Sequence, residues 1–350
     1  MRLKAFQRSA SFLHEPMSTN AKAPLPNSPC RRVPGILMAS ALAAALASSA
    51  VLAQSYPSKL IRFIVGAPPG SMPDTIPRMM TEKLAQKMGQ PVIIAPHPGA
   101  AGLTSAQVTI RSPADGHTIQ VYTSSDTLAP LLSPGTVDPK DLLAVATVAS
   151  VPTALVVAAN NSFRSLDEVI NMAKAQPGKL VASSAGYNTA THLSLEKLRI
   201  ATGTEFLHVP AKGGVAALTE LLGDRADIYF APVPAAMELV RAGKIRMLSM
   251  ASPKRTVLFP NVPTSLELGY KDSDYFFWIG VAVSAKTPAA IVQRINREIN
   301  ATVADKDMSE RFLKVGAEPL TMAMPDFQAL VHGELASNAT LIKTKGFKPE

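Results

Sequence analysis

Residues 60–74 have the sequence LIRFIVGAPPGSMPD, in which an apolar run passes directly into a proline-glycine turn. Pro68 and Pro69 cannot continue a strand, and Gly70 permits backbone conformations closed to other residues. Asp74 can accept hydrogen bonds from the first N–H groups of a following helix. We therefore expect a strand–turn–helix junction whose helix N-terminus faces an anion. Such a site needs no catalytic side chain, so the pattern favours a binding protein over an enzyme.

The N-terminal segment is typical of a secretory leader. Arg31 and Arg32 precede an apolar run at residues 36–52, and the compact residues at its end predict cleavage after Ala53. The alternative is a membrane anchor, but a run this short and rich in Ala and Ser is a weak span. Twin-arginine export and a start at Met17 also remain open. We expect residues 1–53 to be removed and the protein to reside in the periplasm.

Composition excludes several functions. The formal charge of +9 at pH 7 includes six basic residues and one acid of the leader, so residues 54–350 carry about +4. Their cations are scattered, which argues against a nucleic-acid partner. The only cysteine, Cys30, precedes the cleavage position, so we expect no disulfide and no cysteine-based zinc site. No histidine pair has metal-ligand spacing and no nucleotide-binding motif occurs, so we expect no metal and no cofactor.

After residue 54, short β-branched runs alternate with amphipathic stretches, which predicts βαβ units. In the first series we expect strands at residues 60–65, 92–95, 118–123, 143–148 and 154–158, and helices at 74–88 and 102–110. In the second series we expect helices at residues 165–175, 189–200, 213–222 and 233–242, and strands at 180–184, 205–208, 226–230, 245–251 and 276–283. Three helices are expected to close the chain at residues 288–303, 308–315 and 325–343.

No flexible linker separates the two series, so we expect two lobes that the chain crosses through strands, near residues 154–160 and 276–283. The predicted fold is α/β: residues 54–155 plus 277–350 form lobe 1, and 156–276 form lobe 2. Each lobe is expected to be a mainly parallel sheet flanked by helices. This is the layout of a hinged receptor with its ligand between the lobes, and we expect it to be a monomer.

Four small or polar loops lie between a predicted strand and a predicted helix, at residues 69–74, 97–102, 124–127 and 184–192. Ligands of open parallel sheets bind beyond the carboxyl ends of the strands. One such loop is ordinary turn chemistry, but four together predict a ligand cleft. For Asp74 helix capping is the favoured role, and for His192 a structural role. The predicted ligand-binding residues are Pro69, Gly70, Ser71, Asp74, Gly99, Ala100, Ala101, Gly102, Ser124, Ser125, Asp126, Gly186, Asn188, Thr189, His192 and Ala231.

The motifs of residues 55–346 together resemble the periplasmic solute receptors of tripartite tricarboxylate transporters, the Bug receptors. The motifs are YPSK at 56–59, PPG at 68–70, PGA-x-G at 98–102, ADGHT at 114–118, AQPGKL at 175–180, SAG at 184–186, HL at 192–193, HVP-x-KG at 208–213, AGKIR at 242–246 and P-x-VPT at 260–264. The resemblance implies a type II-like, two-lobe periplasmic binding protein fold. It also implies a small carboxylate, amino acid or aromatic acid held by loop backbone, hydroxyl groups and bridging waters.

The chain departs from the family pattern in the predicted loops. Ser71 and Ala101 add side chains where backbone would approach the ligand, and Met72 replaces a small or hydroxylated residue. Further departures are His97, Pro73, Tyr187, Asn188, Ala211, Ala231 and Pro232. The function expected from the resemblance is capture of a small organic anion for membrane permease subunits. The alternatives are a solute sensor that feeds a sensor kinase, a secreted hydrolase that uses the same cleft, and a structural protein.

Overall fold

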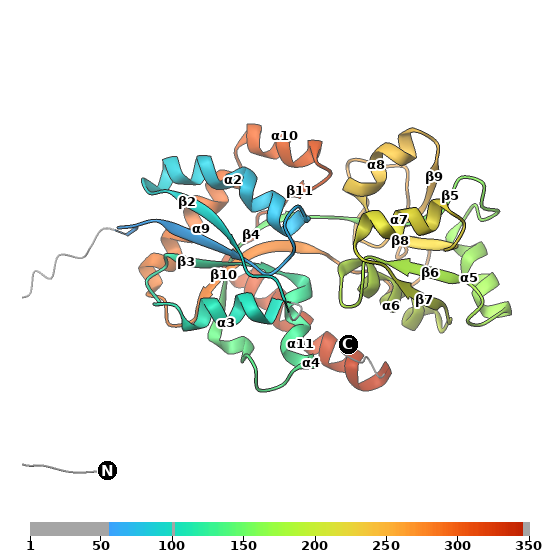
Figure 1. Ribbon diagram of the computed structural model, residues 1–350, viewed down its shortest axis with the longest axis horizontal. Helices are drawn as coiled ribbons and strands as arrows, with labels where there is room; N and C mark the ends of the chain where they lie inside the picture. Colours follow the sequence, from blue (N-terminus) through green and yellow to red (C-terminus); the bar gives the residue numbers. More distant parts are fainter. Residues whose placement is uncertain (1–55, 100–101, 346–350) are drawn as a thin grey trace, which may run out of the picture. The chain divides into compact units, whose positions relative to one another are not determined.

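The computed structural model describes residues 56–99 and 102–345 (Figure 1). The leader, its predicted cleavage after Ala53, and the predicted site residues Ala100 and Ala101 lie outside the described residues. No helix within the described ranges has the length and apolarity that a membrane crossing requires.

The first sheet has six strands in the order β11-β4-β10-β3-β1-β2. Strands β1 and β2 are parallel, as are β1 and β3, whereas β10 runs antiparallel to both β3 and β4. The short β11 is antiparallel to β4 at the edge. The strands are β1 (Ile61–Val65), β2 (Val92–Pro96), β3 (Thr118–Thr123), β4 (Leu142–Ser150), β10 (Trp278–Ser284) and β11 (Glu318–Pro319).

Helices cover both faces of this sheet because its strands alternate between two apolar cores. In β10, Ile279 and Val281 pack into one core, and Trp278 and Ala282 pack into the other. The first core is closed by α2 (Met72–Met88), α9 (Ala289–Val303) and α10 (Lys306–Lys314), and the second by α11 (Met324–Lys345). Leu103 and Ala106 of α3 (Leu103–Arg111) form a smaller cluster with Ala129 of α4 (Ala129–Leu132). Figure 1 shows α2 and α10 on one side of the sheet and α3 and α11 on the other.

The second sheet has five strands in the order β7-β6-β8-β5-β9. Strand β6 is parallel to β7 and β8, and β5 is antiparallel to β8 and β9. Its strands are β5 (Thr153–Ala158), β6 (Val181–Ser184), β7 (Leu207–Pro210), β8 (Ile228–Pro232) and β9 (Ile245–Met250). Helices α5 (Leu166–Ala175) and α6 (Ala190–Thr202) cover one face, and α7 (Gly214–Leu222) and α8 (Val233–Arg241) cover the other.

The chain passes from the first sheet to the second at Val151 and Pro152, between β4 and β5, and returns just before β10. The N–H of Val151 donates to the carbonyl of Phe277 at 2.9 Å, so the two crossing segments are hydrogen-bonded to each other. The predicted crossing at residues 154–160 is therefore wrong by a few residues, because β5 already belongs to the second sheet.

The predicted α/β architecture with two helix-flanked sheets is confirmed, and each predicted strand and helix is present with bounds shifted by no more than a few residues. The prediction of mainly parallel sheets needs correction, because both sheets are mixed. The strands next to the crossings run antiparallel to their neighbours. Several short elements were not predicted: α4, β11 and the 3₁₀ turns η2 (Ser124–Thr127) and η3 (Pro139–Asp141).

Candidate functional site

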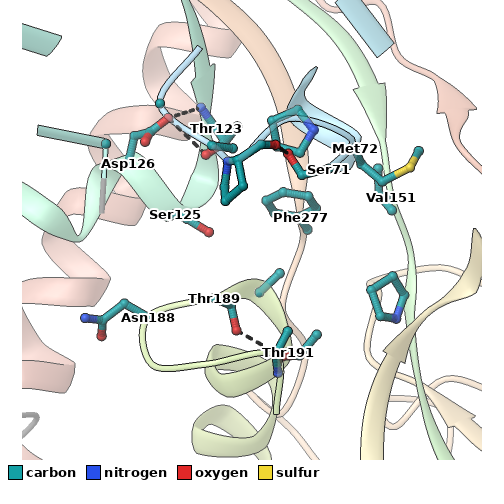
Figure 2. A pocket seen from close by; sticks show the side chains of 18 of the residues that line it. Ser71, Met72, Thr123, Ser125, Asp126, Val151, Asn188, Thr189, Thr191 and Phe277 are labelled. Carbon is teal, nitrogen blue, oxygen red and sulfur yellow. Dashed lines mark hydrogen bonds between the residues drawn. The ribbon is translucent and has the colours of Figure 1, made fainter. Parts of the chain in front are cut away.

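A cavity of about 310 Å³ lies between the loops of the two sheets, beside the crossing segments (Figure 2). Among the described residues that line it there is no lysine, arginine or histidine. The lining consists of Gly66, Ala67, Pro68, Ser71, Met72, Pro73, Gly102, Val121, Thr123, Ser125, Asp126, Val151, Thr153, Ala185, Tyr187, Asn188, Thr189, Ala190, Thr191, Pro232 and Phe277.

The β1–α2 loop supplies the first part of the wall. Ser71 is the N-cap of α2, and its hydroxyl donates to the carbonyl of Pro68 at 2.6 Å instead of accepting from the helix. Asp74 lies inside α2 and turns back, so that its carboxylate accepts from the N–H of Gly70 at 3.0 Å and pairs with Arg78 at 2.8 Å. The predicted cap is therefore corrected: Asp74 fixes the turn that precedes the helix, and it does not line the cavity.

The pKa of Asp74 is consistent with this structural role. Burial raises the pKa, but the hydrogen bonds from Arg78 and Gly70, with the charge of Arg78, outweigh burial and hold it below its usual value. The carboxylate is therefore ionised near neutral pH and already paired within its own helix.

The β2–α3 and β3–η2 loops meet at the next part of the wall. Gly102 is the N-cap of α3 with φ 96°, and a Cβ at this position would lie 1.9 Å from Oδ1 of Asp126. The other carboxylate oxygen of Asp126 accepts from the N–H of Thr123 at 2.7 Å and from its hydroxyl at 2.9 Å. Burial raises the pKa of Asp126 to about 7, against the opposing effect of these bonds. Asp126 is thus the one described lining residue whose charge changes near neutral pH.

A second carboxyl group lies in the layer behind this wall. Glu334 of α11 accepts from Nε1 of Trp278 at 2.7 Å, and burial raises its pKa to about 8. The hydroxyl groups of Ser124 and Tyr275 are 3.0 Å apart and buried in the same layer. Ser124 is therefore directed into the protein, whereas Ser125 lines the cavity.

The β6–α6 loop forms the opposite wall. Thr189 is the N-cap of α6, and its hydroxyl donates to the carbonyl of Gly186 at 2.7 Å while accepting from the N–H of His192 at 3.5 Å. Thr191 accepts from the N–H of Ala185 at 2.8 Å and lies 2.9 Å from the Thr189 hydroxyl. These bonds leave the loop with a fixed shape, in which the first turn of α6 is directed at the cavity.

Behind this wall two imidazole rings are stacked. The ring centroids of His192 and His208 are 4.4 Å apart at 15°, and Tyr187 contacts both rings edge-on. Nδ1 of His192 accepts from the N–H of Asn188 at 3.2 Å. Burial, with the charges of His208 and Arg199, lowers the pKa of His192 to about 3. His192 therefore supports the loop as a neutral ring.

Four helices begin at the cavity, which is the most informative property of the site. The lining includes the N-terminal ends of α2 (Ser71), α3 (Gly102), α6 (Thr189) and α8 (Pro232). Each helix N-terminus carries a partial positive charge, so their convergence favours an anionic group without a cationic side chain. In α8 the N–H of Val233 is already bonded to the carbonyl of Pro152, and Pro73 of α2 and Pro234 of α8 have no N–H.

Six predicted site residues line the cavity: Ser71, Gly102, Ser125, Asp126, Asn188 and Thr189. Eight others lie outside its lining, so their contact with a ligand stays a prediction: Pro69, Gly70, Asp74, Gly99, Ser124, Gly186, His192 and Ala231. Sequence reasoning missed the apolar lining residues Val121, Val151 and Phe277, which no polar or glycine signal marks. Met72, Tyr187 and Pro232 were visible only as departures from the family pattern.

The comparisons with known proteins agree with this arrangement. Residues 76–347 match the sequence profile of the tripartite tricarboxylate transporter family receptor. The chain is 32% identical to protein BugT of Bordetella pertussis over 88% of this chain and 95% of that protein. A solved periplasmic transporter is 28% identical with a TM-score of 0.74, covering 84% of this chain and 99% of its own. An R. palustris protein solved with adipate has the same identity and TM-score, covering 84% of this chain and all of its own.

Proposed function

The chain belongs to the family of tripartite tricarboxylate transporter receptors, and on that premise we propose that it captures a small carboxylate in the cavity between its two sheets. The family is one of periplasmic transport receptors, which bind a solute without converting it. The proposed receptor acts in the periplasm as a monomer after cleavage at Ala53. It delivers its ligand to the membrane permease subunits of a tripartite transporter.

The observation that carries the proposal is the convergence of four helix N-termini from both sheets on one cavity. A carboxylate placed there meets backbone N–H groups and partial positive charge on two sides. A relative of 28% identity was solved with adipate, which supports a carboxylic acid as the ligand of this chain.

We propose further that residues 54–155 plus 277–350 and residues 156–276 act as two lobes that close on the ligand, with the first boundary moved to residues 152/153 so that β5 stays within one lobe. The chain passes between the sheets twice, and the hydrogen bond between Val151 and Phe277 joins the two passages. Rotation about such a pair changes the cavity while leaving the main apolar cores of each sheet intact, and it moves Leu128 against Leu193 in a smaller buried cluster that spans both lobes. Both residues also line the cavity, so ligand contact and closure involve the same segments.

The test is thermal unfolding of the purified protein across a series of mono-, di- and tricarboxylates and amino acids. We expect at least one acid to raise the melting temperature in proportion to the logarithm of its concentration, because binding to the folded state alone stabilises it. Thr189→Trp should abolish that rise by filling the cavity. Val215→Trp, at a position 82% exposed on α7, should retain it. If no acid or amino acid raises the melting temperature, the proposal is wrong.

A further inference from the structure

The cavity has two polar edges that face each other across an apolar middle. Figure 2 shows Ser125 and Asp126 on one side and Thr189 and Thr191 on the other, with Phe277 on the side of the cavity towards Val151. The apolar part also includes Met72, Val121, Val151 and Pro232. A ligand that spans the cavity therefore has a body in contact with apolar side chains and two ends in different polar surroundings.

The two polar edges differ in charge. On the Thr189 edge no acidic residue belongs to the described lining, and the first turn of α6 is directed at the cavity. On the opposite edge Asp126 lies beside the start of α3, and no cationic side chain lines the cavity to balance it. A carboxylate on the Thr189 edge thus meets the first turn of α6 and no acidic group of the described lining, whereas one near Asp126 meets another carboxyl group.

Three of the lining hydroxyl groups cannot compensate for this difference, because they are already hydrogen-bonded within the protein. The protons of the Ser71 and Thr189 hydroxyls are committed to the carbonyls of Pro68 and Gly186, and the Thr123 hydroxyl is hydrogen-bonded to Asp126 itself. A carboxylate at the Asp126 edge would leave two acidic groups in a small, largely apolar space, and one of them must take up a proton or lose its solvation.

From this asymmetry we propose that the receptor selects monocarboxylates with an apolar or aromatic body and that Asp126 excludes ligands with a second carboxylate. The inference rests on the proposed function, because it assigns the ligand class of the same cavity. The carboxylate binds at the Thr189 edge, and the apolar body lies against Met72 and Phe277. The uncharged end faces Asp126. The chain therefore differs in preference from its relative solved with the dicarboxylate adipate.

The experiment compares hexanoate with adipate, two acids of equal carbon number that differ by the second carboxylate. Titration calorimetry at pH 8, where Asp126 is largely ionised, should show hexanoate binding at least tenfold more tightly than adipate. Benzoate extends the comparison to an aromatic body. In Asp126→Asn the preference should fall to within about threefold, because the amide can still accept from Thr123 and repels no carboxylate. Asp307→Asn removes an acid that is 69% exposed on α10 and should leave the preference unchanged.

A second variant tests the apolar middle. Met72→Ser should weaken hexanoate and benzoate more than adipate, because it removes apolar contact from the body of the ligand. Adipate binding as tightly as hexanoate in the unmodified protein would overturn the inference and leave the proposed function standing. A preference that persists in Asp126→Asn would overturn the role of Asp126. Failure of all mono-, di- and tricarboxylates and amino acids to bind would remove the proposed function and, with it, this inference.

Discussion

At both edges of the cavity burial favours the neutral form of ionisable side chains, which are carboxyl groups at one edge and imidazole rings at the other. The Asp126 edge is a carboxyl edge: Asp126 lines it and Glu334 lies behind it, and burial raises their pKa values to about 7 and 8. The Thr189 edge is an imidazole edge: behind it are the stacked rings of His192 and His208, whose pKa values are lowered, chiefly by burial. In both places desolvation favours the neutral form. The charge that a ligand meets is therefore set largely by the helix N-termini, with Asp126 as the group that alters it near pH 7.

The edges also differ in how tightly their loops pack. At the carboxyl edge a Cβ on Gly102 would lie 1.9 Å from Oδ1 of Asp126, so the carboxylate would have to move and strain its hydrogen bonds to Thr123. At the imidazole edge a Cβ on Gly186 would first meet the carbonyl oxygen of Ala211 at 3.5 Å, an ordinary contact. Both glycines have positive φ, 96° and 123°, so a matched pair of alanine variants separates packing from backbone strain.

The largest effect is expected for that pair. Gly186→Ala should cost about 1–2 kcal/mol through backbone strain alone, and Gly102→Ala about 2 kcal/mol more because it also displaces Asp126. Urea unfolding of both variants and the unmodified protein measures the difference. Equal losses would mean that the loop around Asp126 is as loosely packed as the loop around Gly186. The two edges would then not differ in packing.

The next effect is the response of the imidazole edge to acid. The pKa of His192 is about 3 in the folded protein against about 6.5 in a free chain. Its contribution to stability is fully present above pH 6.5 and is lost as pH falls toward 3. We expect a loss of about 2 kcal/mol between pH 7 and pH 5. Burial is the main cause of this low pKa, and positive charge on His208 and Arg199 adds to it.

Replacing His192 by Gln should remove most of this slope, because glutamine does not titrate. The measurement is the free energy of unfolding at pH 5, 6 and 7 for both proteins. If the variant loses stability with acid as steeply as the unmodified protein, the loss is caused by a group other than His192.

At the carboxyl edge the pH dependence should have the opposite sign. Glu334 has a folded pKa of about 8, above its usual 4.5, so the folded state holds its proton longer than the unfolded chain. Its neutral form is favoured in the fold, and stability falls as pH rises from about 4.5 to 8. Glu334→Gln keeps an acceptor for Trp278 and should raise the free energy of unfolding by about 1 kcal/mol at pH 8.5.

The same substitution should have little effect at pH 5, where Glu334 is already protonated. Melting temperatures at pH 5 and 8.5 check both statements. A variant that is less stable than the unmodified protein at pH 8.5 would show that the fold stabilises Glu334 as an anion. Burial would then not favour the neutral form at both edges.

The sequence predicts the elements of this molecule well because each carries a local periodic signal. Alternation in β10 places Trp278 and Ile279 in different cores, and the three- and four-residue spacing of Ile76, Met80 and Leu84 marks the buried face of α2. The antiparallel pairs could not be predicted in this way. Strand direction at the crossings depends on which sheet a segment joins, and no residue in 151–158 encodes that choice locally.

The site could be predicted only in part, for a related reason. Glycine and hydroxyl residues at strand ends indicate loops near a ligand, and Ser71, Gly102 and Thr189 do line the cavity. Phe277 has no such signal, because an apolar residue before a strand is indistinguishable from core. The neighbours that shift the pKa of a group are distant in sequence as well: Glu334 reaches Trp278 across 56 residues, and His192 reaches His208 through the pairing of β6 with β7.

The smallest effect compares the two N-caps that face each other across the cavity. The Thr189 hydroxyl accepts from the N–H of His192 in α6, whereas the Ser71 hydroxyl makes no such bond to α2 and donates outward to Pro68. Thr189→Ala should therefore cost about 1 kcal/mol, and Ser71→Ala no more than a few tenths. Thr189→Ser keeps the hydroxyl and should recover most of the loss. Urea unfolding at pH 7 resolves these values, and equal costs for the two alanine variants would mean that the cap hydrogen bond at Thr189, 3.5 Å long, contributes nothing.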